Sequence, residues 1–468
     1  MPAYCPHPLQ AAHPRLARQR GAIAVMVALS MIVLLGVVGL VVDGGMSYII
    51  KARLNAAVDA AALAGARAVP LGNNQAEQRA SAQAAAANFF NANIGGTFML
   101  ATPKLLGVDV AFNAGTVTID VRAEAPMPVS FMQVLGFTAL NPYASAQTIR
   151  KDLDMALVVD TSGSLSSSSA GVRTAAKSFL EKFNVTQDRV GLIHFAYGAE
   201  VDNPIRTSGR GFDRAAMLEK IGSYSFSGST ASVEGMWHAR DQLNRITALN
   251  RSSLRVIVFF SDGVPNALGG FLPFTTASDC THAGVFDING NGLYKLDVTG
   301  GQLISDGCRL RRPVKNGPST EMGDVVSKLP DWYNAHNDAA NPNDPAKREF
   351  AIVTSSPRVV TADISSSTMV NRNIDRAARN LPEAVAAKAR DEGMYVFTLG
   401  MGSDLKKKSG VDNEVGENVL KCMANVADGP ARCYDAKQPV GMYCYAATEA
   451  DLTPCFSRLA SAILRISK

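Results

Sequence analysis

The chain has 468 residues, of which 47% are hydrophobic and 19% are charged, and this composition excludes a wholly disordered protein. At about 150 residues per domain, a chain of this length is expected to form roughly three structural units. The formal net charge of +5 is too small for so long a chain to indicate nucleic-acid binding. We therefore expect a folded protein whose partners do not include nucleic acid.

An uncharged apolar segment lies near the N-terminus, from Gly21 to Val42. Its 22 residues suffice to cross a hydrocarbon core of about 30 Å as a helix, whereas the apolar region of a secretory signal peptide has about 7–15 residues. We therefore expect a retained transmembrane helix over 21–43, preceded by a tail of residues 1–20. Three arginines precede the segment, which favours a cytoplasmic N-terminus by the positive-inside rule.

An Ala-rich helical region and a small β region follow the apolar segment. Residues 44–95 combine high helix propensity with a weak apolar stripe, which predicts a long helix leaving the membrane and a second helix over 75–91. Residues 96–151 show alternating apolar residues on either side of a turn at 113–115. This alternation predicts a small β region, closed by a further strand near 143–149.

From residue 152 to 468, strands and helices alternate, which predicts an α/β domain with a mostly parallel sheet. Between about 264 and 370 lies an insertion rich in Gly, Asn, Asp and Pro, in which we expect one strand, 350–354. An insertion of this length in a compact domain is typically functional or a separate subdomain. The other expected strands are 154–160, 189–195, 255–261 and 395–399, and the expected helices are 170–183, 213–221, 231–246 and 451–466.

Six of the seven cysteines follow the apolar segment. An even number on the exported side predicts three disulfide bonds in an oxidising compartment, with the connectivity left open. Closeness in sequence suggests that the first two pair with each other and the last four among themselves. The last four are 11 residues apart, which disfavours a zinc site with CxxC-type spacing. The six residues are Cys280, Cys308, Cys422, Cys433, Cys444 and Cys455.

Oxygen-bearing side chains gather where two expected strands of the α/β domain end. Asp160, Ser162 and Ser164 lie in the run MALVVDTSGSLS, and Asp262 ends the run RVIVFFSD. A further hydroxyl, Thr230, lies in a Gly-Ser-Thr loop before a helix. Open α/β sheets bind ligands at the carboxyl ends of strands, and carboxylate and hydroxyl oxygens suit Mg²⁺, Mn²⁺ or Ca²⁺. We therefore predict a divalent-cation site; the alternative is a helix-capping turn at the first two residues.

These motifs resemble those of a von Willebrand factor type A domain with its metal-ion-dependent adhesion site, over residues 153–468. The resemblance implies a Rossmann-like fold in which Ser162, Ser164 and Thr230 are hydroxyl ligands. It implies that Asp160 and Asp262 act on the cation directly or through water, and that the acidic side chain of a protein partner completes the coordination. The insertion exceeds the usual connection in this family, which leaves open whether the metal face is covered.

The run RQRGAIAVMVALSMIVLLGVVGLVVDGGMSYIIKARLNAAVDAAALAGA resembles the TadE/TadG-like segment of Flp (tight-adherence, Tad) pilus assembly proteins. In combination with the C-terminal domain, it is similar to the TadG-like proteins. The resemblance implies a bacterial inner-membrane protein with one span and a periplasmic or surface-exposed C-terminal domain. Prepilins carry Glu at the fifth position after a cleaved Gly, whereas Met26 stands there relative to Gly21. This difference favours an anchor that is not processed.

The insertion contains a candidate second cation site. Asp287, Asn289 and Asn291 match the opening of an EF-hand calcium loop, D-x-[DN]-x-[DN]-G. The twelfth position holds Val298 in place of a bidentate Glu, with Asp297 one residue earlier. The alternative is a tight turn, which Asn-Gly sequences favour.

We expect a non-enzymatic protein that acts in pilus assembly or adhesion by binding the carboxylate of a pilus or secretion component through the cation. The sequence contains no HExxH, G-x-S-x-G or GxxxxGK[ST], the motifs of the commonest proteases, hydrolases and P-loop proteins. His194 is expected to be a packed strand residue. One alternative is an anchored binding module of another complex, for example one working with an AAA+ ATPase. A metal-dependent hydrolase would need a general base beside the cation.

Overall fold

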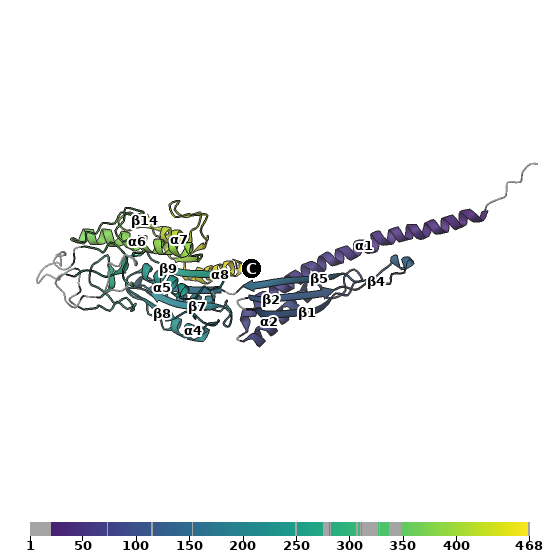
Figure 1. Cartoon of the computed structure of the whole chain (residues 1–468), viewed down its shortest axis with the longest axis horizontal. Helices are drawn as coiled ribbons and strands as arrows, with labels where there is room; N and C mark the ends of the chain where they lie inside the picture. Colours follow the sequence, from purple (N-terminus) through teal and green to yellow (C-terminus); the bar gives the residue numbers. More distant parts are fainter. Residues whose placement is uncertain are drawn as a thin grey trace, which may run out of the picture. The chain divides into compact units, whose positions relative to one another are not determined.

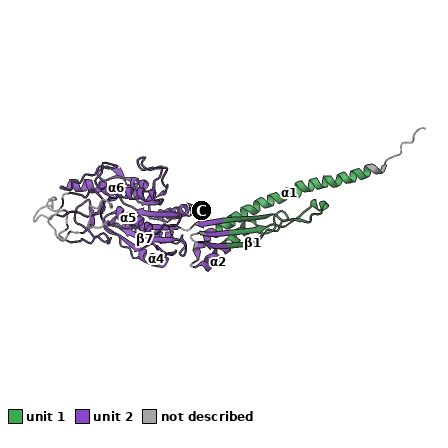
Figure 2. Ribbon diagram, in the orientation of Figure 1, with its two compact units in different colours: residues 1–64, 85–109, 120–147 green, residues 65–84, 110–119, 148–468 purple. Residues whose placement is uncertain are grey.

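The computed structural model describes residues 20–466, apart from 73, 114–115, 152, 249, 275–279, 281, 306–307, 309, 311–325, 327 and 337–347. By their contacts, the residues form two compact units (Figure 2). The first comprises residues 1–64, 85–109 and 120–147, and the second comprises 65–84, 110–119 and 148–468.

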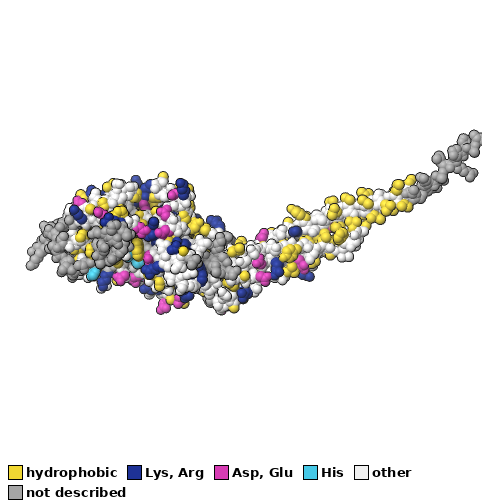
Figure 3. All heavy atoms as spheres, in the orientation of Figure 1, with side chains coloured by type: hydrophobic (Ala, Val, Ile, Leu, Met, Phe, Trp, Pro, Cys, Tyr) yellow, Lys and Arg dark blue, Asp and Glu magenta, His cyan; other side chains and the backbone are white. Residues whose placement is uncertain are grey.

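The apolar N-terminal segment is part of one long helix, α1 (Arg20–Ala68). From Ile23 onward this helix is long and apolar enough to cross a membrane, with a mean hydropathy of 3.0 over an 18-residue window. Its apolar side chains up to Val42 are largely exposed, and they gather along the helix in Figure 3. The expected continuation of the apolar helix into the Ala-rich region is confirmed. After a short 3-10 turn, η1 (Val69–Leu71), the expected second helix is present as α2 (Gln75–Ile94).

The small β region is also present. Strands β1 (Lys104–Asn113), β2 (Thr116–Glu124) and β5 (Tyr143–Lys151) form a three-stranded sheet in the order β1-β2-β5. Between β2 and β5, the short strands β3 (Met127–Pro128) and β4 (Ala139–Leu140) pair antiparallel. They carry a loop that includes the 3-10 helix η2 (Met132–Leu135).

The C-terminal domain is built on a six-stranded sheet in the order β15-β12-β9-β6-β7-β8. Neighbouring strands run parallel, except that β8 is antiparallel to β7. The expected α/β fold with a mostly parallel sheet is confirmed, whereas the two edge strands, β8 and β15, were not predicted. The strands are β6 (Leu153–Asp160), β7 (Arg189–Phe195), β8 (Ala199–Asn203), β9 (Leu254–Ser261), β12 (Tyr395–Met401) and β15 (Met442–Ala446).

Helices cover both faces of this sheet (Figure 1). Because successive side chains of a strand point to opposite faces, Leu157 and Val159 pack with one set of helices, and Ala156 and Val158 pack with the other. Every residue of β6 is buried, as expected for a central strand of a parallel sheet. The first set is α3 (Ser169–Leu180), α4 (Arg214–Gly222) and α8 (Glu449–Ile466); the second is α5 (Ser232–Asn244), α6 (Ser367–Asp391) and α7 (Glu417–Ala424).

The insertion begins with an antiparallel pair, β10 (Ala267–Gly270) and β11 (Gly284–Asp287). The prediction of a strand over 350–354 is wrong, because this segment makes isolated bridges at Ala351 and Thr354 rather than a continuous ladder. The amides of Ile352 and Val353 both donate to the carbonyl of Asp331, which bends the segment away from an extended partner.

Glu234 on α5 fastens the insertion to the domain. Its fully buried carboxylate accepts hydrogen bonds from the Gly269 amide at 2.7 Å and the Tyr333 hydroxyl at 3.0 Å, and lies 2.6 Å from Nε2 of His336. Burial alone would raise the pKa of Glu234, but His336 and the hydrogen bonds outweigh it and hold this pKa below its usual value. Three positions of the insertion are thus tied to one side chain of α5.

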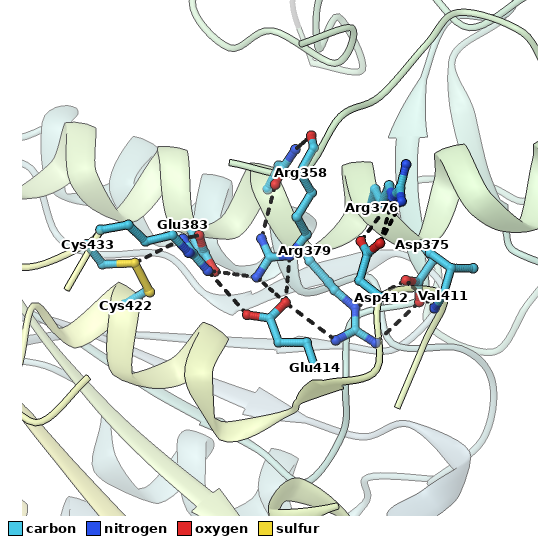
Figure 4. A network of polar contacts seen from close by, with 12 residues as sticks. Arg358, Asp375, Arg376, Arg379, Glu383, Val411, Asp412, Glu414, Cys422 and Cys433 are labelled. Carbon is cyan, nitrogen blue, oxygen red and sulfur yellow. Dashed lines mark hydrogen bonds and ion pairs between the residues drawn. A yellow bond between two sulfur atoms is a disulfide. The ribbon is translucent and has the colours of Figure 1, made fainter. Parts of the chain in front are cut away.

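A polar network ties the end of the insertion to α6 and to a later loop (Figure 4). Arg358 donates to Glu414 at 2.7 Å and to Glu383 of α6 at 3.0 Å. Arg432 also donates to Glu383 at 3.0 Å. Arg358 and Glu383 are buried, and each has a second charged partner, Glu414 for Arg358 and Arg432 for Glu383, so the network keeps both buried charges paired.

The expected disulfide bonds are present. Cys280 is joined to Cys308 within the insertion, Cys422 of α7 to Cys433, and Cys444 of β15 to Cys455 of α8. The last of these bonds closes a sequence separation of 11 residues and links the edge strand to the C-terminal helix.

We expect that replacing both Cys444 and Cys455 with Ala will destabilise the α/β domain by about 2–4 kcal/mol, because the cross-link restricts the unfolded chain. The measurement is the melting temperature of the full-length protein in detergent without reductant. Thr453→Ala, on an exposed position of α8, is the control and should melt like the wild type. Equal melting temperatures for the double variant and this control would contradict the prediction.

Candidate metal centre

Four of the five predicted ligands lie at the carboxyl ends of β6 and β9, which are neighbours in the sheet. Asp160 is the last residue of β6, and Asp262 follows the last residue of β9. Ser162 and Ser164 lie at the start of the 3-10 helix η3 (Gly163–Ser168), and Thr230 lies in the loop before α5. The topology therefore brings three separate segments of the chain to one edge.

Asp160 organises the turn after β6. Its buried carboxylate accepts a hydrogen bond from the amide of Ser162 at 2.7 Å through one oxygen, and from the hydroxyl of Ser261 at 2.6 Å through the other. Ser261 was not among the predicted residues. Its signal in the sequence was its position directly before Asp262, at the end of the apolar strand.

The side chains of Ser162, Ser164 and Asp262 form a continuous chain of contacts. The hydroxyls of Ser162 and Ser164 are 3.2 Å apart, and the Ser164 hydroxyl donates to the Asp262 carboxylate at 2.8 Å. Four of the five predicted residues are thus linked by hydrogen bonds that start at Asp160 and end at Asp262.

Thr230 is held beside the same group. Its amide donates to the side-chain oxygen of Asn266 at 2.8 Å, a contact that the sequence did not predict. A Cβ atom on Gly263 would lie 3.2 Å from the Thr230 hydroxyl, so this hydroxyl sits next to the residue that follows Asp262. The loop before Thr230 is fixed because the amide of Gly163 donates to the carbonyl of Gly228 at 3.0 Å.

The charges at the site are unbalanced. Burial raises the pKa of Asp160 to about 6, and burial together with the nearby Asp160 raises the pKa of Asp262 to about 8. Asp404, in the 3-10 helix η5 (Ser403–Lys406), also raises the pKa of Asp262. Among the residues that the structure describes, no cation forms an ion pair with Asp160 or Asp262. A donor set of two carboxylates and three hydroxyls therefore fits a hard divalent cation, which would supply the missing positive charge.

The candidate calcium loop in the insertion contributes to the same region. Asp287 accepts hydrogen bonds from the amides of Asn289 at 3.0 Å and Gly290 at 3.1 Å, which are the contacts of a tight turn. Its other oxygen accepts from the hydroxyl of Ser229 at 3.2 Å, next to Thr230. Asn291 is exposed and follows this turn, and Asp297 lies in a second turn. Calcium binding by this segment stays a prediction.

A second polar cluster lies on β7 and β8. His194, Glu200 and Asp202 can bring one ligand atom each within 4.8 Å of one another. Both ring nitrogens of His194 already have partners, Asp202 at 2.9 Å and the Thr299 hydroxyl at 3.2 Å, and the ring stacks on Tyr224. His194 is buried in its strand, as the sequence predicted.

Two family models match the chain. Residues 154–288 match the model of the von Willebrand factor type A domain, and residues 21–68 match the Flp pilus-assembly TadE/G-like model. The chain carries a von Willebrand factor type A domain behind a TadE/G-like segment. The match to the von Willebrand factor type A domain includes all five predicted cation ligands and ends within the insertion, after β11.

Similar solved structures are distant. The PilB minor pilin from Streptococcus sanguinis is 12% identical, with a TM-score of 0.37 over 79% of each chain. The pilus adhesin SpaC from Lactobacillus rhamnosus GG is 14% identical, with a TM-score of 0.37 over 78% of this chain and 35% of that chain. The vWF domain of the type V pili tip protein Mfa5 from Porphyromonas gingivalis is 14% identical, with a TM-score of 0.36 over 69% and 98%. Likeness at this level does not bear on what the protein binds. No curated protein sequence matches the chain.

Proposed function

We propose that this protein is a membrane-anchored pilus assembly or adhesion protein that binds a partner carboxylate through a divalent cation. The cation is Mg²⁺, with Mn²⁺ or Ca²⁺ as alternatives, and its ligands are Asp160, Ser162, Ser164, Thr230 and Asp262. The observation that carries the proposal is that a buried carboxylate, a half-buried carboxylate and three hydroxyls meet at one sheet edge without a cationic partner among the described residues. Oxygen ligands from one side leave positions on the cation for an acidic side chain of the partner.

We propose that α1 anchors the protein in the bacterial inner membrane with its N-terminus in the cytoplasm. The arginines before the apolar segment support this orientation. The three disulfide bonds support a periplasmic or surface-exposed C-terminal domain, because such bonds persist in oxidising compartments. The TadE/G-like match supports pilus or secretion components as partners, and we propose binding, not catalysis, as the role of the site.

The test is affinity capture with the full-length protein from solubilised membranes of the source bacterium, in Mg²⁺ or in EDTA. Thr230→Val removes one hydroxyl ligand and keeps the side-chain shape and the amide hydrogen bond to Asn266. Thr174→Val is the matched control, because its hydroxyl is exposed on α3 and bonds to the carbonyl of Ala170. We expect the wild type and the control to capture pilus components in Mg²⁺ alone, and Thr230→Val to lose them.

Two outcomes would contradict the proposal. Capture that persists in EDTA would show that the partner does not need the cation. Equal capture by Thr230→Val and Thr174→Val would show that binding occurs elsewhere on the molecule.

A further inference from the structure

The loop between β3 and β4 presents apolar side chains to its surroundings. Phe131, Val134, Leu135 and Phe137 are between 41% and 50% exposed, and no residue from 125 to 149 is charged. A cluster of this kind on a protein surface marks a contact with another protein or with a membrane.

Asp43 fastens this loop to α1. Its carboxylate is fully buried and accepts hydrogen bonds from the amides of Ser130 at 3.1 Å, Phe131 at 2.9 Å and Met132 at 2.8 Å. Asp43 is also the first charged residue after the apolar segment of α1. The loop is therefore attached at the point where the expected membrane span ends.

From Asp43, the loop runs back along the apolar part of α1. A Cβ atom on Gly39 would lie 3.1 Å from the Met132 amide nitrogen, and one on Gly36 would lie 3.2 Å from Cδ2 of Leu135. Gly36 precedes Asp43 by seven residues, which corresponds to about 10 Å along a helix. The small glycines let the loop approach α1 closely at this depth.

Several amide donors of the loop have partners in the loop or on α1, as a water-free environment requires. Besides the three amides held by Asp43, the amides of Val134 and Gly136 donate to carbonyls of the same loop. The side-chain amide of Gln133 donates to the carbonyl of Val129 at 3.0 Å. Irregular backbone can therefore enter the bilayer here without exposing these donors to lipid.

We infer that the loop of residues 129–137 is inserted into the outer leaflet of the lipid bilayer beside α1. This inference rests on the proposed membrane anchor. Lipid is the occupant that fits, because the loop packs against a part of α1 in which Val33, Val37 and Leu40 are more than half exposed. Hydrophobic side chains gather along this helix in Figure 3. The second contact with the bilayer fixes the rotation and depth of α1, and so the position of the small β region at the membrane.

The test uses the full-length protein in liposomes whose lipids carry bromine on the acyl chains, which quenches nearby tryptophan fluorescence. Phe137→Trp places the probe in the loop, and Phe89→Trp on α2 is the matched control, because the two side chains are 49% and 53% exposed. On α2, the carbonyl of Asn93 accepts from Arg53 at 3.4 Å. Arg53 lies ten residues beyond Asp43, about 15 Å outside the span, so α2 is far from the lipid chains.

We expect brominated liposomes to quench the fluorescence of Phe137→Trp more strongly than that of the wild type. The wild-type signal comes from Trp237 and Trp332 and is the baseline. Phe89→Trp should match the wild type. Val134→Trp repeats the measurement at a neighbouring exposed position, in case Phe137→Trp does not fold.

Flotation of the liposomes separates the two ways in which the test can fail. A protein that does not float with the lipid has no anchor, and the proposed localisation is then wrong. A protein that floats, but whose loop probes are quenched no more than Phe89→Trp, is anchored by α1 alone. In that case the loop faces water or a protein partner, and the inference is overturned.

Discussion

Replacing Asp160 with Asn is expected to abolish tight Mn²⁺ binding while the protein remains folded. The substitution keeps the size of the side chain, and an amide can still accept from the Ser162 amide and contact the Ser261 hydroxyl. It removes one of two negative charges at the site. Loss of an outer-shell partner alone lowers metal affinity by about 10–100-fold, so we expect a loss of at least about 100-fold here. Calorimetric titration of the full-length protein in detergent measures the effect.

The same variant should be as stable as the wild type without metal, or more stable. Burial raises the pKa of Asp160, so the charged form is disfavoured in the folded state, and a neutral isostere removes that penalty. Asp428→Asn is the control, since it makes the same chemical change at a side chain that is 74% exposed and does not contribute to the pKa shifts of Asp160 or Asp262. This control should alter the affinity only slightly because exposed charges are screened. Wild-type Mn²⁺ affinity in a folded Asp160→Asn variant would exclude this residue from the site.

The predicted ligands could be found from the sequence because each stands at a strand end or at the start of a helix. A parallel sheet brings such positions to one edge regardless of the conformation of the loops. Ser261 and Asn266 could not be assigned in this way. Their roles depend on which oxygen of Asp160 faces β9, and on how the loop before Thr230 packs against its neighbours.

The same limit applies to the fold. The apolar runs of β6, β7 and β9 identify them as buried strands, and the structure confirms all three. Helix α6 was missed although Val370, Ile374, Leu381 and Val385 recur at helical spacing and are buried, because Pro382 interrupts this pattern. The buried Glu383 of α6 is paired with Arg358, which also pairs with Glu414, and these contacts join segments distant in sequence. Sequence periodicity does not report such tertiary pairing.

The affinity for Mg²⁺ should fall steeply as the pH is lowered from 8 to 5. With pKa values of about 6 and about 8, the Asp160–Asp262 pair holds a proton near neutral pH that the cation must displace. Each displaced proton lowers the apparent affinity by about tenfold per pH unit below the pKa. Titration at pH 7 in buffers of different ionisation enthalpy should therefore show proton release, and Asp262→Asn should release less. Proton-neutral binding with an affinity that does not change with pH would contradict this mechanism.

Because proton binding is linked to folding, the change of stability with pH should have opposite signs with and without the cation. Both carboxyls have pKa values raised above their ordinary value of 3.8, so between about pH 4 and pH 8 the folded protein binds more protons than the unfolded chain. The stabilising effect of these protons is complete at low pH and is lost as the pH rises through 6 and 8, so the metal-free domain should melt at a lower temperature at pH 8 than at pH 5. Saturating Mg²⁺ favours the charged pair and should reverse this trend, because the cation then replaces the protons. Repulsion between Asp160 and Asp262 destabilises the metal-free domain when both carboxylates are charged. A bound cation relieves this repulsion, and the relief adds to the affinity for the cation. The pair therefore favours cation binding over a purely structural role.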